Sequence, residues 1–486
     1  MRKPLRRAVT SDTGGAASRL TAILTAGMVG VLVAHNQLGA TLIAGMVLLL
    51  LLLLIRPAWL TIVTVAIIWL VPAQTAPGGM LDSATVLNWL GMVVVPAISL
   101  LVVAVSWVDR SRRQEPVTSV PQDVMLGAMA YAVTLVVLGL GHGNAPAGVI
   151  QSAVAYLRYP VLFLALVYSG FERRYVLAVV GTLVSIGAIA GVESIIRHLT
   201  VGARWDSISL LLGSYGTFSL GAVFVLMACA IAGAAATSKL RLWHALAFIM
   251  IGLVSLWGEI KALTIAIPLS VLGVLVGLSR AKRLTWRLIA VVAGIVLGVG
   301  LLVSAWGAFW GENDDLSRAS GDLASVFAGE MSLTQASNRV GWMARSVEYM
   351  ARHDALLFGF GPGSGLAGTA TGGQDLMLGS ISGIGRTQVS VLLWEGGVFG
   401  LGIYWVMLLL VVAHIWRGIG PSVTGIDLLL MVTLLGFSVY YVLIGPMYDL
   451  VWRYDVPSMA FWVLSAYVVG RREGLPAPHA SLSALQ

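Results

Sequence analysis

The sequence predicts an all-α polytopic membrane protein of about 14 transmembrane helices, with both termini in the cytoplasm and one large extracytoplasmic loop that contains an amphipathic helix. Three observations support this fold class. The composition is 58% hydrophobic and only 11% charged, many apolar segments are long enough to span a bilayer, and basic residues gather in alternate connections. Because a soluble domain carries about 25% charged residues, the chain is suited to lipid rather than water.

The apolar segments have the length that a spanning helix needs, about 20 residues. Their centres lie near Met28, Leu48, Val65, Val95, Tyr131, Phe163, Ile186, Val223, Ile249, Pro268, Ile295, Ile403, Leu434 and Leu464. They divide the chain into about 11 spans in residues 1–309, a large loop in residues 310–388, about three spans in residues 389–472 and a cytoplasmic tail in residues 473–486.

Basic residues indicate the orientation of these spans. About twenty of the 30 Lys and Arg lie on the side of the N-terminus, which the positive-inside rule assigns to the cytoplasm. They include Arg56, the run from Asp109 to Arg113, Arg173 with Arg174, Lys239 with Arg241, Arg280 to Arg287, Arg417, and Arg471 with Arg472. The net charge of +8 is therefore no sign of nucleic-acid binding, because no soluble basic domain carries it.

Cysteine usage excludes two further classes of site. Cys229 is the only cysteine and lies within an apolar segment, so the chain has neither an intramolecular disulfide framework nor a cysteine-based metal cluster. No other residues have a spacing that predicts metal ligands.

The loop of residues 310–388 is far longer than an ordinary connection, which predicts a function for it. Residues 337–352 have the pattern of a helix with Ser337 or Asn338 as its N-cap. The glycine-rich stretch Leu357 to Gly365 follows and predicts tight backbone turns.

The cations that remain on the outer side suggest an anionic ligand, because the positive-inside bias disfavours them there. A lipid-linked pyrophosphate is one such ligand, since Arg and Lys can neutralise its charge as it leaves a sugar. These cations are Arg158, Arg197, Arg204, Lys261, Arg318, Arg339, Arg345, Arg352, Arg386 and Arg453.

Several of these residues also allow a purely structural interpretation. Lys261 follows Glu259 at a tight outer turn, where it either binds the ligand or snorkels beside a structural carboxylate. Arg345 falls on one helix face with Glu348 and Arg352, as in a solvated ladder of charges. Arg339 instead shares a face with apolar residues, as in a helix that lies on the membrane and directs a cation into a cavity.

Other polar residues also allow either a structural or a functional role. His353 and Asp354 follow the loop helix and either supply a general base or cap the helix. Glu193 and Arg197, at i and i+4, are expected to form a stabilising ion pair. Arg158 precedes Tyr159-Pro160 nearer the membrane interior, where a cation is harder to explain structurally.

Two segments resemble bacterial O-antigen ligases and related polysaccharide polymerases. Residues 338–363, Asn-Arg-Val-Gly-Trp-Met-Ala-Arg-Ser-Val-Glu-Tyr-Met-Ala-Arg-His-Asp-Ala-Leu-Leu-Phe-Gly-Phe-Gly-Pro-Gly, resemble that family's outer loop: Arg, Trp, an amphipathic helix, then Gly-x-Gly-x-Gly. Residues 386–400 look like its His-Asn segment followed by Leu-x-Glu-x-Gly-x-x-Gly. Lys261 stands where ligases carry a Ser-Arg at a helix end.

The resemblance implies a metal-independent, cofactor-free glycosyltransferase in the bacterial cytoplasmic membrane, with its active site on the extracytoplasmic side. Its donor would be an undecaprenyl-pyrophosphate-linked glycan and its acceptor a glycan or lipid-glycan, joined with inversion. Membrane lipids, a chain-length regulator and a flippase would be its partners. The expected catalytic residues are Arg339, Arg386, Lys261, His353 and Glu395, and the expected substrate-binding residues are Arg158, Arg345, Glu259 and Asp354.

Arg386 departs from the family pattern, because it occupies the position of the family's histidine. Arginine cannot serve as a base, since its pKa exceeds about 12. Another group would then activate the acceptor, with His353, Asp354, Glu348 and Glu395 as candidates, or no strong base is needed. The change also favours a polymerase over a ligase. Glu395 has a structural alternative as a buried hydrogen-bond acceptor.

Two other functions fit the same composition. A transporter or flippase for lipid-linked glycans would also need many helices and outer cations, but it should show broken helices in matching halves or intramembrane charges along a path, and the sequence shows neither strongly. A non-catalytic scaffold of an envelope-assembly complex would tolerate neutralisation of Lys261, Arg339 and Arg386.

Overall fold

The computed structural model describes the central and C-terminal parts of the chain. The described residues are 95–96, 99–100, 103–104, 121–202, 216–237, 242–257, 262–298 with short gaps, 339–362, 364 and 387–473 with short gaps. All of them belong to one compact unit, Thr64–Gln486. They contain helices and turns and no strand.

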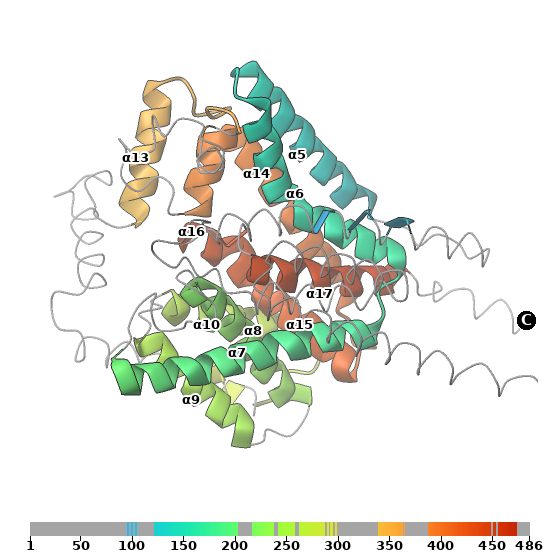
Figure 1. The fold of residues 1–486 in the computed structure, drawn as a ribbon. Coiled ribbons are helices and arrows are strands. Elements are labelled where there is room, and N and C mark those ends of the chain that lie inside the picture. The colour runs from blue at the N-terminus through green and yellow to red at the C-terminus, as the bar shows by residue number, and fades with distance from the viewer. Residues whose placement is uncertain are drawn as a thin grey trace, which may run out of the picture. The chain divides into compact units, whose positions relative to one another are not determined.

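The described helices follow one another as Figure 1 shows: α5 (Gln122–Gly141), α6 (Pro146–Ser169), α7 (Arg173–Val201), α8 (Gly216–Thr237), α9 (Leu242–Trp257), α10 (Leu263–Arg280), α13 (Arg339–Arg352), α14 (Gln388–Gly418), α15 (Gly425–Val439), the π-helical turn η5 (Tyr440–Ile444), α16 (Gly445–Tyr448) and α17 (Asp455–Glu473).

Six segments of the described residues are long and apolar enough to cross a membrane: α5, α6, α7, α10, α14 and the continuous run Gly425–Tyr448. The prediction of an all-helical membrane-type chain is therefore confirmed for this part. The apolar segments centred near Met28, Leu48 and Val65 lie outside the described residues.

Small residues let the helices pack closely. An added Cβ at Gly436 in α15 would lie 2.6 Å from the carbonyl oxygen of Ser270 in α10 and 2.9 Å from the sulfur of Cys229 in α8. Gly273 in α10 faces the α-carbon of Gly436 in the same way. Close backbone approach at small residues is how helices associate in lipid, where the hydrophobic effect no longer favours burial between helices. Cys229 is accordingly a packed, fully buried thiol.

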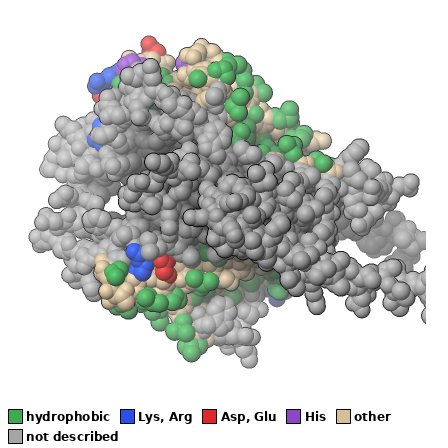
Figure 2. Space-filling model, viewed as in Figure 1, with side chains coloured by type: hydrophobic (Ala, Val, Ile, Leu, Met, Phe, Trp, Pro, Cys, Tyr) green, Lys and Arg blue, Asp and Glu red, His purple; other side chains and the backbone are tan. Residues whose placement is uncertain are grey.

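The outward face of α5 is apolar along its length. Leu126, Met129, Val133, Val137 and Leu140 are each more than half exposed. Figure 2 shows hydrophobic side chains in green over the region of α5, whereas one group of charged side chains lies over the end of α13. A helix that exposes apolar side chains over its whole length is suited to contact with lipid.

Charged residues join several helices at the end that lies away from α13. Asp427, at the start of α15, accepts a hydrogen bond from the Tyr467 hydroxyl at 2.8 Å and pairs with Arg471 of α17. Arg173 of α7 lies 3.8 Å from the same carboxylate. The sorting of basic connections predicts that Arg173 and Arg471 lie on one side, and their shared partner agrees with that prediction.

The π-helical turn η5 leaves backbone carbonyls without the usual helical donors. The indole N–H of Trp452 donates to the Tyr441 carbonyl at 2.7 Å, and that of Trp405 donates to the Val442 carbonyl at 3.0 Å. Two tryptophans from different parts of the chain thus satisfy the carbonyls that the irregular turn releases.

Candidate functional site

Helix α14 is interrupted near its N-terminal end. Gly397 has φ 64° and ψ −168°, a conformation that essentially only glycine adopts. The helix starts after Thr387, whose side chain accepts a hydrogen bond from the Ser390 amide at 3.2 Å. Residues 388–396 therefore form a short first segment, and residues 398–418 continue the helix in Figure 1.

The glycine-rich segment Ala355–Pro362, here called the strap, occupies this break. The carbonyl oxygens of Leu356 and Leu357 accept the amides of Val398 and Phe399 at 3.0 and 3.1 Å. In the other direction, the Phe360 amide donates to the Trp394 carbonyl at 2.7 Å. The strap therefore replaces helical hydrogen bonds that the break in α14 removes.

Glycines make the contact between the strap and α14 possible. A Cβ at Gly359 would lie 2.7 Å from both the Trp394 oxygen and the Gly397 nitrogen, and a Cβ at Gly397 would lie 2.2 Å from the Leu357 oxygen. Gly359 and Gly361 both have positive φ, of 68° and 83°. The tight turns that the sequence predicts are thus confirmed, and their purpose is close approach to α14.

Glu395 lies two residues before Gly397 and is completely buried. Its carboxylate accepts a hydrogen bond from the Ser152 hydroxyl of α6 at 3.3 Å. A carboxylate is costly to bury inside a protein, so this fully buried position is a candidate for function. The expected role as a hydrogen-bond acceptor and the expected catalytic role are both compatible with this geometry.

An aromatic cluster fixes the loop helix α13 to the first segment of α14. Tyr349 stacks on Trp394 with ring centroids 5.6 Å apart, and Phe360 of the strap lies 4.5 Å from Trp394. Ser346 and Met350 of α13 are also buried. The predicted helix is confirmed over residues 339–352, whereas its predicted cap residues Ser337 and Asn338 lie outside the described residues.

His353 and Asp354 form the end of α13. The Ala355 amide donates to the Met350 carbonyl at 2.9 Å, and Asp354 adopts the left-handed φ of 57° that this type of helix end requires. His353 is exposed, stacks on Tyr349 at 4.1 Å and directs Nδ1 at the Tyr349 carbonyl, 2.8 Å away. Of the two alternatives for these residues, this geometry favours a cap over a general base.

The charges along α13 follow the predicted ladder. Arg352 pairs with Glu348 at the exposed end of the helix, and Arg345 is half-buried one turn earlier. Glu193 and Arg197 of α7 form the predicted ion pair at 3.8 Å.

Four of the expected site residues are placed only in part or not at all, and the further outer cations Arg204, Arg318 and Arg453 lie outside the described residues. Arg339 is the first residue of α13, and only its backbone is described. Lys261, Glu259 and Arg386 lie outside the described residues, although Arg386 directly precedes the N-cap of α14.

Arg158 is a buried cation deeper in the protein. It is 4% exposed, and its guanidinium lies 4.8 Å from the centre of the Tyr159 ring. Ser152 precedes Arg158 by six residues on α6, a rise of about 9 Å, so α6 carries both the Glu395 partner and this cation.

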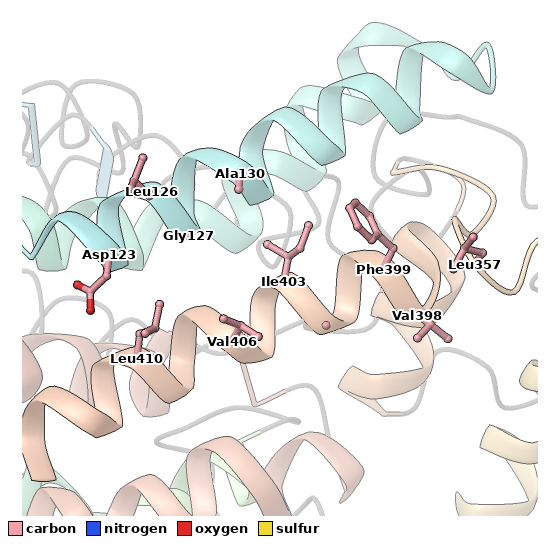
Figure 3. Close-up of a pocket in the computed structure, with 11 residues that line it drawn as sticks. Asp123, Leu126, Gly127, Ala130, Leu357, Val398, Phe399, Ile403, Val406 and Leu410 are labelled. Carbon is pink, nitrogen blue, oxygen red and sulfur yellow. The ribbon is translucent and has the colours of Figure 1, made fainter.

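An apolar groove runs between α5 and α14 and ends at the strap. It has a volume of about 650 Å³ and is lined almost entirely by apolar side chains. Figure 3 shows Asp123 at one end and Phe399 with Leu357 at the other. Asp123 is held there by His414 of α14, whose Nε2 lies 2.9 Å from the carboxylate.

Sequence reasoning missed three residues that build this site. Ser152 and Asn144 are small polar residues without a motif, and only the fold shows that they contact Glu395 and the strap. Gly397 falls within the predicted Leu-x-Glu-x-Gly-x-x-Gly pattern, but the pattern gives no sign that the helix breaks there. Two glycines in succession beside a buried Glu are the available signal.

The described residues contain no group of three or more His, Cys, Asp or Glu side chains placed to hold a metal ion. Their helices and site define a protein with apolar, membrane-length helices, one of which is interrupted beside a buried carboxylate and closed by a loop segment. No protein-family model matches the chain, and no curated protein matches its sequence.

Proposed function

We propose that the protein is an integral membrane glycosyltransferase that polymerises polyprenyl-pyrophosphate-linked oligosaccharides at the outer face of a bacterial cytoplasmic membrane. One observation carries this proposal. The two segments that resemble the ligase and polymerase family are separated in sequence, yet the strap after α13 lies in the break of α14 at Gly397, two residues after the buried Glu395. The segment expected to be the outer loop and the buried carboxylate thus form one structural unit.

The proposed reaction is a displacement at the anomeric carbon of the donor sugar. The acceptor hydroxyl forms the new glycosidic bond, and the bond from the anomeric carbon to the pyrophosphate oxygen breaks with inversion. The acceptor proton passes to a carboxylate, for which Glu395 is the buried candidate. Arg339, Lys261 and Arg386 hold the departing pyrophosphate, because guanidinium and ammonium groups stabilise developing phosphate charge.

The groove between α5 and α14 supports lateral entry of a lipid-linked substrate. Its apolar lining suits a hydrocarbon chain, and its end at Leu357 and Phe399 lies beside the strap. A chain lying in this groove would bring the head group toward the loop side of α14. Asp123 and His414 close the other end of the groove and keep the two helices together there.

The interruption in α14 also gives weight to the rival transport function, because discontinuous helices are typical of transporters. In those proteins the released backbone groups face the transported ion or substrate. Here the backbone groups released around Gly397 form three hydrogen bonds with the strap instead, through the amides of Val398 and Phe399 and the carbonyl of Trp394. A sealed break of this kind fits a fixed catalytic wall better than a transport path.

The decisive experiment uses purified full-length protein with a lipid-pyrophosphate-linked oligosaccharide as donor and acceptor, in the presence of a chelator. We expect lengthening by the wild type and a loss of at least about 100-fold in Arg339→Ala, as for removal of a charge-stabilising group. Arg352→Ala is the matched control, because Arg352 is exposed and paired with Glu348. Transport of the lipid without lengthening would reject the proposal in favour of the rival function.

A second variant tests the carboxylate separately. Glu395→Gln keeps a hydrogen-bond acceptor for Ser152 and should leave the melting temperature nearly unchanged. If Glu395 accepts the proton, lengthening should fall by about 100-fold or more. Full activity of Glu395→Gln would assign Glu395 to structure alone.

A further inference from the structure

The turn between α5 and α6 contacts the strap through one side chain. Asn144 donates from Nδ2 to the carbonyl oxygens of Phe360 and Pro362, both at 3.1 Å. Because both neighbours are acceptors, the amide nitrogen rather than the oxygen must face them. More than two hundred residues separate Asn144 from the strap, so this contact joins two distant parts of the chain.

The strap is shaped to receive this side chain. The two accepting carbonyls lie on either side of Gly361, where an added Cβ would be 2.5 Å from Asn144 Nδ2 and 3.0 Å from the Leu138 oxygen. Pro362 packs against α5 at Gly139, where a Cβ would lie 3.1 Å from the proline ring. The absence of a side chain at Gly361 thus lets the strap approach the turn between α5 and α6, just as Gly359 lets it approach α14.

The contact continues through the strap to the candidate active site. Phe360 makes two of these hydrogen bonds. Its carbonyl accepts from Asn144, and its amide donates to the Trp394 carbonyl at 2.7 Å. Trp394 is followed by Glu395, whose carboxylate bonds Ser152 of α6. Asn144 also lies just before α6. The hairpin of α5 and α6 therefore contacts the strap through Asn144 in its turn and contacts Glu395 through Ser152, about two helical turns further along α6.

We infer that Asn144 is a positioning residue, whose side-chain amide holds the strap in the break of α14 and thereby fixes the Glu395 carboxylate against α6. Asn144 itself does not touch the reacting atoms. The kinetic consequence rests on the proposed function, whereas the contact and its effect on the strap do not.

Hydrogen exchange of the full-length protein in lipid nanodiscs tests the contact. Asn144→Asp preserves the size of the side chain but replaces the donor with an acceptor that faces two carbonyls. Amides of the strap should then exchange at least about tenfold faster, and those of α10 should be unaffected. His142→Ala is the control, because His142 lies in the same turn, is exposed and bonds its own helix at the Leu138 carbonyl. Unchanged exchange of the strap in Asn144→Asp would overturn the inference.

A double-mutant cycle tests the same contact without relying on one substitution. Gly361→Ala places a methyl group against the Asn144 amide, so it should cost less strap protection in an Asn144→Ala background than in the wild type. Additive effects would show that the two residues are independent and would overturn the contact. Asn144→Ser, which retains a single donor, replaces Asn144→Asp in the exchange experiment if the latter does not fold.

Kinetics test the positioning role. In the lengthening assay, Asn144→Asp should lower kcat between about tenfold and a hundredfold with KM for the donor within about twofold, since small displacement of a reacting group has this effect. Faster strap exchange with wild-type kcat would overturn the positioning role. If the wild type lengthens nothing, the proposed function fails, while the exchange experiment and the cycle still decide whether Asn144 holds the strap.

Discussion

Substitution of Gly397 tests whether the break in α14 is a built feature of the protein. In Gly397→Ala, the new methyl carbon would lie 2.2 Å from the Leu357 oxygen and 2.5 Å from the Phe358 nitrogen. These are backbone atoms, so they cannot move away as a flexible side chain would. The residue would also keep a φ of 64° and a ψ of −168°, which an alanine does not tolerate.

The expected cost follows from these two effects. Backbone strain of this kind costs about 1–3 kcal/mol. Displacement of the strap would also remove three backbone hydrogen bonds, each worth about 1 kcal/mol net. We therefore expect Gly397→Ala to destabilise the protein by about 4–6 kcal/mol, which corresponds to a fall in melting temperature of at least about 5 °C.

Gly396→Ala is the matched control, because an added Cβ at Gly396 meets nothing within 4 Å. Alanine also favours the helix by up to about 1 kcal/mol, so this variant should be as stable as the wild type or slightly more so. Both variants can be followed by tryptophan fluorescence at one scan rate in the same detergent, since membrane proteins often unfold irreversibly. Equal melting temperatures for the two variants would refute the idea that the strap is fitted into the break.

Two further substitutions should separate function from stability. Gly402→Leu fills the groove at a position where an added Cβ meets nothing within 4 Å. The KM for the lipid-linked donor should rise at least about fivefold, while the melting temperature stays unchanged or rises. An unchanged KM would argue that the groove holds no substrate. Asp427→Asn removes the common partner of Arg173 and Arg471 and should lower the free energy of unfolding by about 1–2 kcal/mol. Glu172→Gln, in an exposed ion pair, should lower it by less than about 1 kcal/mol. Equal losses of stability in the two variants would contradict the central place of Asp427.

The helices could be predicted because lipid leaves the backbone few choices. Every peptide group at membrane depth needs an internal partner, so a long apolar segment becomes a helix almost whatever its neighbours are. The windows centred near Tyr131 and Ile186 accordingly match α5 and α7. The loop helix could be predicted for a different reason, since its polar and apolar residues alternate with helical spacing.

The same reasoning misplaced α6. Its apolar window centres near Phe163, whereas the helix runs from Pro146 to Ser169. Its first half contains Ser152 and Arg158, whose polarity lowers the hydropathy there. Both are buried, the former against Glu395 and the latter beside Tyr159. Hydropathy therefore fails at the part of the helix that carries the candidate site, because the site is polar where the window expects apolar residues.

The break in α14 could not be predicted because it depends on partners far away in the sequence. An isolated Gly396-Gly397 pair is compatible with a regular helix, and nothing local selects the conformation of Gly397. Only the strap, which begins some forty residues earlier, supplies the acceptors that Val398 and Phe399 would otherwise lack. Long-range hydrogen bonds of this kind leave no periodic trace in a sequence.

The sealed break in α14 would link stability to the proposed activity at one point of the molecule. An interrupted helix in lipid must satisfy the groups that it releases, and here they are satisfied by a segment that also packs on α13 and on the turn before α6. Glu395 lies within this interlock and is therefore held by three separate elements: α14, α6 and, through Trp394, the strap. Substitutions that loosen the strap should accordingly impair stability and catalysis together, whereas a groove substitution such as Gly402→Leu, remote from these bonds, should impair substrate binding alone.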